Sequence, residues 1–253
     1  MCFNKEFTLA FTLLSVVVGT YIILGKGMWA KMEQWRRVRI SACFYFFAFM
    51  EGIQFIEYLV IDQCGNIINI VWTQLGYYHI CFQPLFSNIA FSALDSKNTL
   101  RERDVNWKYI FYFCTVAGVL MALRMIIPGL TDQRNQFMRI CTEQIEGFCG
   151  PKTCSMTGNY HLKWTFKLLK PSYVFPSIAS HFMNMFVTPI LMGQTLGSVV
   201  LFLSGPAIAA FFNATSGEQA SIWCFFSIME VCVTVTTQYI VCKRGAQKII
   251  KTN

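Results

Sequence analysis

The stretch that decides the fold is YLVIDQCGNIINIVW, residues 58–72, in which a short polar break, DQCGN, separates two long apolar runs. Aspartate, glycine and asparagine are typical of tight turns, because they tolerate the backbone conformations that reverse a chain. The break at 62–66 therefore predicts two antiparallel helices that are neighbours in space. It also places a cysteine, Cys64, in the turn between them.

Apolar runs of this kind recur along the whole chain of 253 residues, of which 55% are hydrophobic and 13% charged. A helix needs roughly 20 apolar residues to cross a hydrocarbon core of about 30 Å. The runs are apolar on all sides, which favours helices over the alternating strands of a barrel. We expect an all-α bundle over residues 1–253, a multi-pass protein of a plasma or inner membrane. The sequence predicts seven transmembrane helices, at approximately 7–25, 38–61, 67–93, 107–127, 173–192, 195–213 and 220–242.

The net charge of +8 is distributed unevenly along the chain. Basic residues of membrane proteins concentrate on the cytoplasmic side, so their positions predict an outside N-terminus and an inside C-terminus. The pattern favours contact with membrane lipid and argues against nucleic acid as a partner. Thirteen of the 21 basic residues follow the first, third and seventh predicted helices: Lys26, Lys31, Arg36, Arg37 and Arg39; Lys97, Arg101, Arg103 and Lys108; and Lys243, Arg244, Lys248 and Lys251.

With this topology, the segment 128–172 is a long outer loop, and its cysteines face an oxidising space. We expect Cys64 to pair with one of the loop cysteines, and the bond to hold the loop as a cap over the bundle. The partner is left open by the sequence. A zinc site made by CGPKTC and His161 is the alternative, but its cysteine spacing fits zinc motifs poorly. The cysteines predicted on the outer side are Cys2, Cys64, Cys141, Cys149 and Cys154.

Ionisable and amide side chains inside membrane helices are costly and therefore indicate functional sites. The tight turn at 62–66 makes Glu51 and His79 neighbours at similar depth, so we expect them to lie in contact. They predict a site for a small ligand or ion, a proton relay, or a divalent metal site with His79 and Glu51 as ligands. A hydrogen-bond network that only joins helices is the structural alternative. The candidate residues are Glu51, Gln54, His79, Gln83 and Glu230.

Further polar residues lie nearer the predicted outer surface. Arg124 and His181 belong to predicted helices, and we expect structural pairing for them. Asn159 and His161 lie in TCSMTGNYHLKW of the cap, above the membrane site. They are candidates for closing that site from outside, although a loop histidine is more often solvated. Together these residues predict a funnel from the cap down to Glu51 and His79.

Several blocks resemble a family of uncharacterised bacterial multi-pass membrane proteins that begin with Met-Cys-aromatic. They are MCF at the start, YLVIDQCGN running into LGYYHICFQPLF, TCSMTGNYHLKW, and SGPAIA followed by SIWCFFSI. The resemblance covers most of the chain and implies the architecture without implying a chemistry. It marks Cys2, Glu51, Gln54, Asp62, Cys64, Asn66, His79, Gln83, Pro84, Cys154, Asn159, His161, Trp164 and Glu218. The turn NATSGEQAS departs from the family's Asn-Pro-rich pattern, which weakens the role implied for Glu218.

Three classes of function fit these observations. The first is a sensor or binding protein with a small ligand or ion at Glu51 and His79. The second is an intramembrane metal-dependent lipid hydrolase, with His79, Glu51 and Glu230 holding a divalent metal. The third is a proton-linked transporter or channel that uses the same residues as a relay. The common catalytic motifs of soluble enzymes are absent from the sequence.

Overall fold

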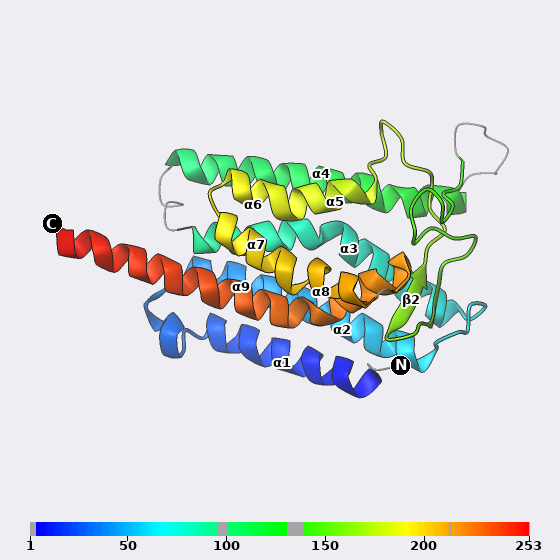
Figure 1. Cartoon of the computed structure of the whole chain (residues 1–253), viewed down its shortest axis with the longest axis horizontal. Coiled ribbons are helices and arrows are strands. Elements are labelled where there is room, and N and C mark those ends of the chain that lie inside the picture. Colours follow the sequence, from blue (N-terminus) through cyan, green and yellow to red (C-terminus); the bar gives the residue numbers. More distant parts are fainter. Residues whose placement is uncertain (1–3, 96–100, 131–138, 213, 253) are drawn as a thin grey trace.

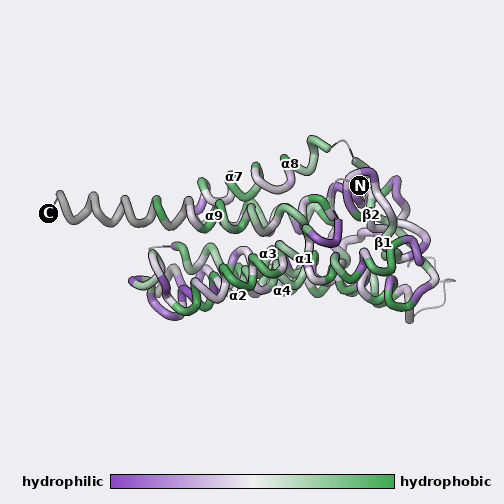
Figure 2. Tube along the Cα trace, turned by 90° about the horizontal axis from the view of Figure 1, so that it is seen from below, coloured by the Kyte–Doolittle hydropathy of each residue, from purple (hydrophilic) through white to green (hydrophobic). Residues whose placement is uncertain are grey.

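The chain folds into a mostly helical bundle, seen in a computed structural model that describes residues 4–95, 101–130, 139–212 and 214–252. The helices run side by side along the long axis of the molecule (Figure 1). A view from below places α7, α8 and α9 in a layer apart from α2, α3 and α4 (Figure 2). The helices are α1 (Lys5–Ile23), η1 (Gly27–Lys31), α2 (Gln34–Leu59), α3 (Ile67–Leu94), α4 (Arg101–Leu130), α5 (Ile178–Phe182), the π-helical η2 (Met183–Val187), α6 (Thr188–Leu191), α7 (Thr195–Ser204), α8 (Pro206–Phe211) and α9 (Ser216–Thr252).

Helices occupy all seven stretches that the sequence predicts as helical. Among the residues that the structure describes, three helical stretches are long and apolar enough to cross a membrane, namely Lys5–Lys31, Gln34–Leu59 and Asp104–Pro128. Ile178–Leu191 and Thr195–Phe211 are apolar but shorter. Length and composition therefore make a membrane location possible, and they establish three candidate spans.

Proline and glycine explain why the fifth and sixth predicted helices are shorter than expected. The segment 171–177 stays outside the helix that was predicted from residue 173, because Pro171 and Pro176 disfavour helical conformation before them. The helix predicted at 195–213 is broken at Gly205, whose φ of −114° and ψ of −91° are not helical. Pro206 then begins α8 as its first residue, where a missing N–H is tolerated.

The predicted cap contains a two-stranded antiparallel hairpin, so the expectation of an all-α fold is wrong in this region. Strand β1 (Cys154–Thr157) pairs with β2 (Leu162–Thr165), with Ser155 opposite Trp164. Apolar and polar residues alternate from residue 162 onward, and this period of two is the pattern of a half-buried strand. Leu162, Trp164, Phe166 and Leu168 are all buried. The cap is therefore part of the core instead of a solvated loop.

The turn at 62–66 is fastened to this hairpin. Cys64 forms a disulfide with Cys154 of β1, with 5.1 Å between the Cα atoms. Thr157 donates to both carboxylate oxygens of Asp62, through its backbone N–H at 2.8 Å and its hydroxyl at 2.5 Å. Asn69 of α3 exchanges two hydrogen bonds with the backbone of Ser155. The predicted bond between Cys64 and a loop cysteine is thus confirmed, and its partner is Cys154.

The second disulfide joins Cys141 to Cys149 within the segment that precedes β1. Cys2 lies outside the described residues. The hairpin lies at the end of the bundle where the chain begins, and the C-terminus lies at the opposite end (Figure 1). The segments η1, the start of α2 and the start of α4 also lie at that opposite end (Figure 1). These are the segments that follow the first and third predicted helices and carry the basic residues discussed above.

Candidate functional site

Glu51 lies in α2 and is completely buried. Neither of its carboxylate oxygens has a hydrogen-bond partner among the residues that the structure describes. No hydrogen bond therefore joins Glu51 to His79, the residue with which contact was expected. His79 does face α2, but its Nε2 meets the carbonyl of Phe46, which precedes Glu51 in that helix.

His79 of α3 is held by other groups. Its Nε2 donates to the Phe46 carbonyl at 2.8 Å, and its Nδ1 accepts from Gln83 Nε2 at 3.5 Å. The imidazole also stacks on the Phe46 ring, with 3.8 Å between centroids. Gln83 Nε2 lies 3.4 Å from Cys224 Sγ of α9. Both nitrogens of His79 are thus engaged, and His79 does not belong to any group of three potential metal ligands found among the described residues.

Gln54 and His161 are brought together although 107 residues separate them in the sequence. His161 Nε2 donates to Gln54 Oε1 at 3.0 Å, and Gln54 Nε2 donates to the Ser221 carbonyl of α9 at 3.2 Å. With Nε2 protonated, His161 Nδ1 accepts from the Tyr58 hydroxyl at 2.5 Å. His161 is therefore a buried bridge between cap and bundle, whereas a solvated loop residue was the alternative.

The environment of His161 disfavours its charged form. The imidazole is completely buried, and burial lowers its pKa to about 3. Glu218 of α9 holds the adjacent turn, since its Oε1 accepts from the backbone N–H groups of Tyr160 at 2.5 Å and His161 at 3.1 Å. Asn159 is exposed at the turn itself, outside this network. The side chain of Glu230 lies outside the described part of the molecule.

A buried ion pair fixes the rest of the cap. Arg124 Nη2 lies 2.5 Å from Glu146 Oε2, and both side chains are buried. The guanidinium also donates to the carbonyls of Leu169 and Pro176. Glu146 was missed by the sequence reasoning. A buried arginine in α4 requires an acidic partner, but TEQIEGFCG offers Glu143 and Glu146 and nothing in the sequence selects between them.

A cavity of ≈ 270 Å³ lies beneath the cap, between α3, α5, α8, α9 and the segment around Gly147. Most of its wall is apolar or aromatic. Gln83 is the candidate site residue that reaches it, and Gln219 and Ser216 add polar groups. The aromatic residues of the wall are Tyr77, Phe148, Phe166, Phe182 and Trp223. A wall of this composition can enclose a small, largely apolar molecule and orient it through a few polar groups.

Comparison with known proteins finds matches that cover most of the chain. Residues 15–243 match the family of unknown function DUF5765. The chain is 23% identical over 245 residues to the uncharacterized protein R287 of Acanthamoeba polyphaga mimivirus, a match that covers 90% of this chain and 92% of the viral protein. No solved structure matches the chain. The resemblance to an uncharacterised family is confirmed, and a bacterial source and seven spans stay predictions. Because the match extends over nearly all of the bundle and the cap, the chain belongs to the DUF5765 family of unknown function.

Proposed function

We propose that the chain is an integral membrane protein that binds a small, largely apolar molecule in the cavity beneath its cap. In this proposal the seven helical passes cross the membrane, and the segment 128–172 forms a disulfide-tied cap on the outer side. The observation that carries the proposal is the cavity of ≈ 270 Å³, which is lined mainly by aromatic and apolar side chains.

Exposed apolar side chains support the membrane location. Val17 of α1 and Tyr112 and Phe113 of α4 each expose more than half of their surface. Contiguous apolar surface on helices of membrane-spanning length is typical of contact with lipid. Three helical stretches of the described residues have that length and composition.

The distribution of charge and of disulfides supports the orientation. The segment from the end of α1 through η1 to the start of α2 lies at the end of the bundle opposite the hairpin (Figure 1), and its sequence carries Lys26, Lys31 and Arg36. Basic residues favour the cytoplasmic side, and disulfides persist in oxidising compartments. Both arguments support an outer location for the hairpin and for the two disulfides of the cap.

The size and lining of the cavity support a ligand role. Its volume is close to the lower end of the range of small-molecule pockets, about 300–1,000 Å³. Gln83 lines the cavity and donates to His79, so among the described residues two of those expected to bind a ligand lie in the cavity wall or next to it. A ligand of one or two rings would fit the aromatic wall.

The experiment measures binding of the neutral fluorophore N-phenyl-1-naphthylamine to protein in detergent, by energy transfer from tryptophan. Ala220→Phe fills the cavity from α9, and Ala179→Phe places the same side chain on the exposed face of α5 as a matched control. Wild type and Ala179→Phe are expected to show saturable binding that Ala220→Phe lacks. Equal saturable binding in all three proteins, at matched melting temperatures, would refute the cavity as the site.

A second candidate is proton-linked transport, and one observation favours it. Glu51 is fully buried without a hydrogen-bond partner among the described residues, which is unusual for a group that serves only structure. Protein in liposomes with an internal pH dye tests this function. A proton flux that Glu51→Gln abolishes would support transport, and equal flux in both proteins would remove it.

A further inference from the structure

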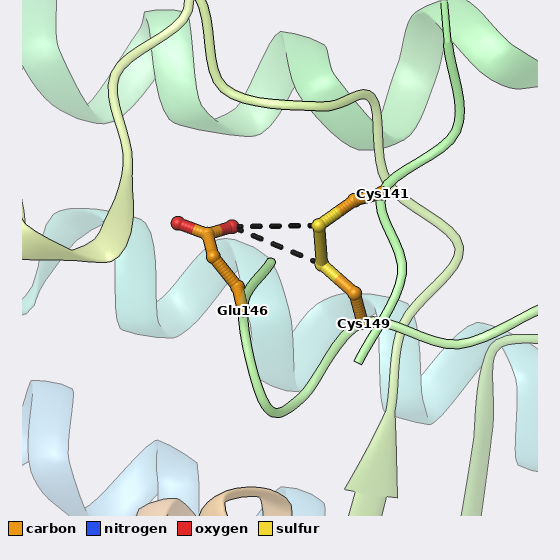
Figure 3. Close-up of side chains that lie close together, drawn as sticks. All are labelled: Cys141, Glu146 and Cys149. Carbon is orange, nitrogen blue, oxygen red and sulfur yellow. Dashed lines mark hydrogen bonds between the residues drawn. A yellow bond between two sulfur atoms is a disulfide. The ribbon is translucent and has the colours of Figure 1, made fainter. Parts of the chain in front are cut away.

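The Cys141–Cys149 disulfide has a carboxylate directly beside it. Glu146 Oε2 lies 3.8 Å from the sulfur of Cys141 and 3.8 Å from the sulfur of Cys149 (Figure 3). All three side chains are buried. The carboxylate is oriented by Arg124 on one oxygen and by the backbone N–H of Ile178, at 2.9 Å, on the other. An acceptor is thus fixed at equal distance from both sulfurs.

This arrangement favours the reduced form of the pair. A disulfide sulfur carries no proton, so in the oxidised protein it donates nothing to Glu146. After reduction both cysteines carry S–H groups, and each lies within reach of the same ionised acceptor. Hydrogen bonds to charged groups are stronger than those between neutral groups. Glu146 therefore stabilises the dithiol relative to the disulfide.

Within the described part of the chain, no carboxylate contact of this kind is found at the other disulfide, where Cys154 Sγ lies 3.5 Å from the neutral carbonyl of Ser155. Cys64 and Cys154 are 90 residues apart in the sequence, and their bond joins the turn at 62–66 to β1 alongside the hydrogen bonds of Asp62 and Asn69. Only 8 residues separate Cys141 from Cys149. A bond that closes a short loop contributes less to stability than one that closes a long loop. The structure therefore loses less when Cys141–Cys149 opens.

Small molecules can approach the pair. Cys141 and Cys149 both line a surface pocket of ≈ 270 Å³, whose rim includes the exposed residues Thr142, Glu143 and Pro151. Each cysteine is almost fully buried, so a large reagent cannot reach the sulfurs directly. A pocket of this size admits a low-molecular-weight thiol and excludes a folded protein.

A metal ion is the other occupant that two cysteines and a carboxylate suggest. The guanidinium of Arg124 lies 2.5 Å from Glu146 Oε2, the oxygen nearest the two sulfurs. A cation bound there would meet this fixed positive charge at close range. The ion pair therefore favours redox chemistry over metal binding at this cluster.

We infer that Cys141–Cys149 is a redox-active disulfide that exchanges with low-molecular-weight thiols entering from the surface pocket. A thiolate attacks one sulfur of the pair, the Cys141–Cys149 bond breaks, and a mixed disulfide forms while the other cysteine leaves as a thiolate and takes up a proton. A second thiolate attacks the sulfur of the bound thiol and releases the remaining cysteine, which is protonated in turn. Two thiols are oxidised to their disulfide, and two electrons and two protons pass to the cysteine pair.

The test equilibrates the purified full-length protein in buffers of reduced and oxidised glutathione. Alkylation followed by peptide mass spectrometry then measures the two disulfides separately. Cys141–Cys149 is expected to open at a ratio of [reduced]² to [oxidised] glutathione at least tenfold lower than Cys64–Cys154, equivalent to about 30 mV. If Cys64–Cys154 opens first, or if both open together, the inference is wrong.

Two variants test the part played by the carboxylate. Glu146→Gln is expected to raise the required glutathione ratio about tenfold, because a neutral amide is a weaker acceptor. Glu143→Gln is the matched control, since Glu143 is an exposed residue of the same pocket, whereas Glu146 is the carboxylate beside the sulfurs. Identical shifts in the two variants would contradict the assigned role. Should Glu146→Gln not fold, the order in which the two disulfides of the wild type open decides alone. Stoichiometric zinc binding by the reduced wild type would overturn the inference and identify the cluster as a metal site.

Discussion

The ion pair of Arg124 and Glu146 makes a quantitative prediction about the cap. Arg124→Met removes a fully buried guanidinium that donates to the Leu169 and Pro176 carbonyls and neutralises Glu146. Removing one partner of a buried pair leaves an uncompensated charge and costs about 3–5 kcal/mol. Arg124→Met is therefore expected to lower the free energy of unfolding by about that amount.

The origin of this loss is tested by removing the second charge as well. Because the uncompensated carboxylate accounts for much of the loss, the double variant Arg124→Met/Glu146→Met is expected to be more stable than Arg124→Met alone. Lys108→Met provides a control in the same helix. Lys108 lies 2.7 Å from Asp104 in an exposed pair, which contributes about 1 kcal/mol or less.

Unfolding of the purified protein by sodium dodecyl sulfate in mild detergent, followed by tryptophan fluorescence, measures these differences. The buried Trp164 of the hairpin makes the signal sensitive to loss of the cap. A loss of stability in Arg124→Met no larger than that in Lys108→Met would contradict the prediction. So would a double variant less stable than the single one, since the buried charge would then not be the cause.

Two further predictions concern the hairpin. Burial lowers the pKa of His161 to about 3, below the usual value of about 6.5, so the unfolded chain binds a proton that the folded chain does not. The free energy of unfolding is therefore highest above pH 6.5 and decreases as the pH drops towards 3, by about 2 kcal/mol at pH 5. His161→Gln should remove this part of the pH dependence, as measured by thermal unfolding. A Cβ on Gly158 would lie 2.4 Å from the His161 carbonyl oxygen and 2.6 Å from Glu218 Cδ, whereas one on Gly52 meets nothing within 4 Å. Gly158→Ala should therefore lower the melting temperature and Gly52→Ala should not, and equal melting temperatures would show that the turn adapts freely.

The helices and the fastening of the cap could be predicted because they depend on local signals. Apolar runs of sufficient length specify helices wherever proline and glycine do not interrupt them, and DQCGN specifies a turn. The hairpin has a local signal as well, the alternation of apolar and polar residues from Leu162 to Leu168, although it lies in a segment, 128–172, whose length favours a loop. The information for a strand is therefore present in the sequence.

The site depended on information that a single sequence does not contain. Glu51 and His79 lie on neighbouring helices, and His79 faces α2, but its hydrogen bond goes to the Phe46 carbonyl, at an earlier position of α2 than Glu51. The choice of Glu146 over Glu143 as partner of Arg124 depends on the path of the cap. The cavity is formed by segments from four helices and the cap, so it exists only after the bundle has assembled.

The spacing of the two disulfides also bears on how the chain is made. Cys64 is synthesised 90 residues before Cys154, so its thiol must remain unpaired while the intervening helices are built. Cys141 and Cys149 emerge before Cys154 and are separated by only 8 residues, and short loops close with a smaller entropic cost. If Cys141 and Cys149 form their disulfide early, neither of them is available to mispair with Cys64. Replacing either one would leave an unpaired cysteine that is synthesised before Cys154. The expected defect is a newly made chain in which this cysteine has formed a disulfide with Cys64.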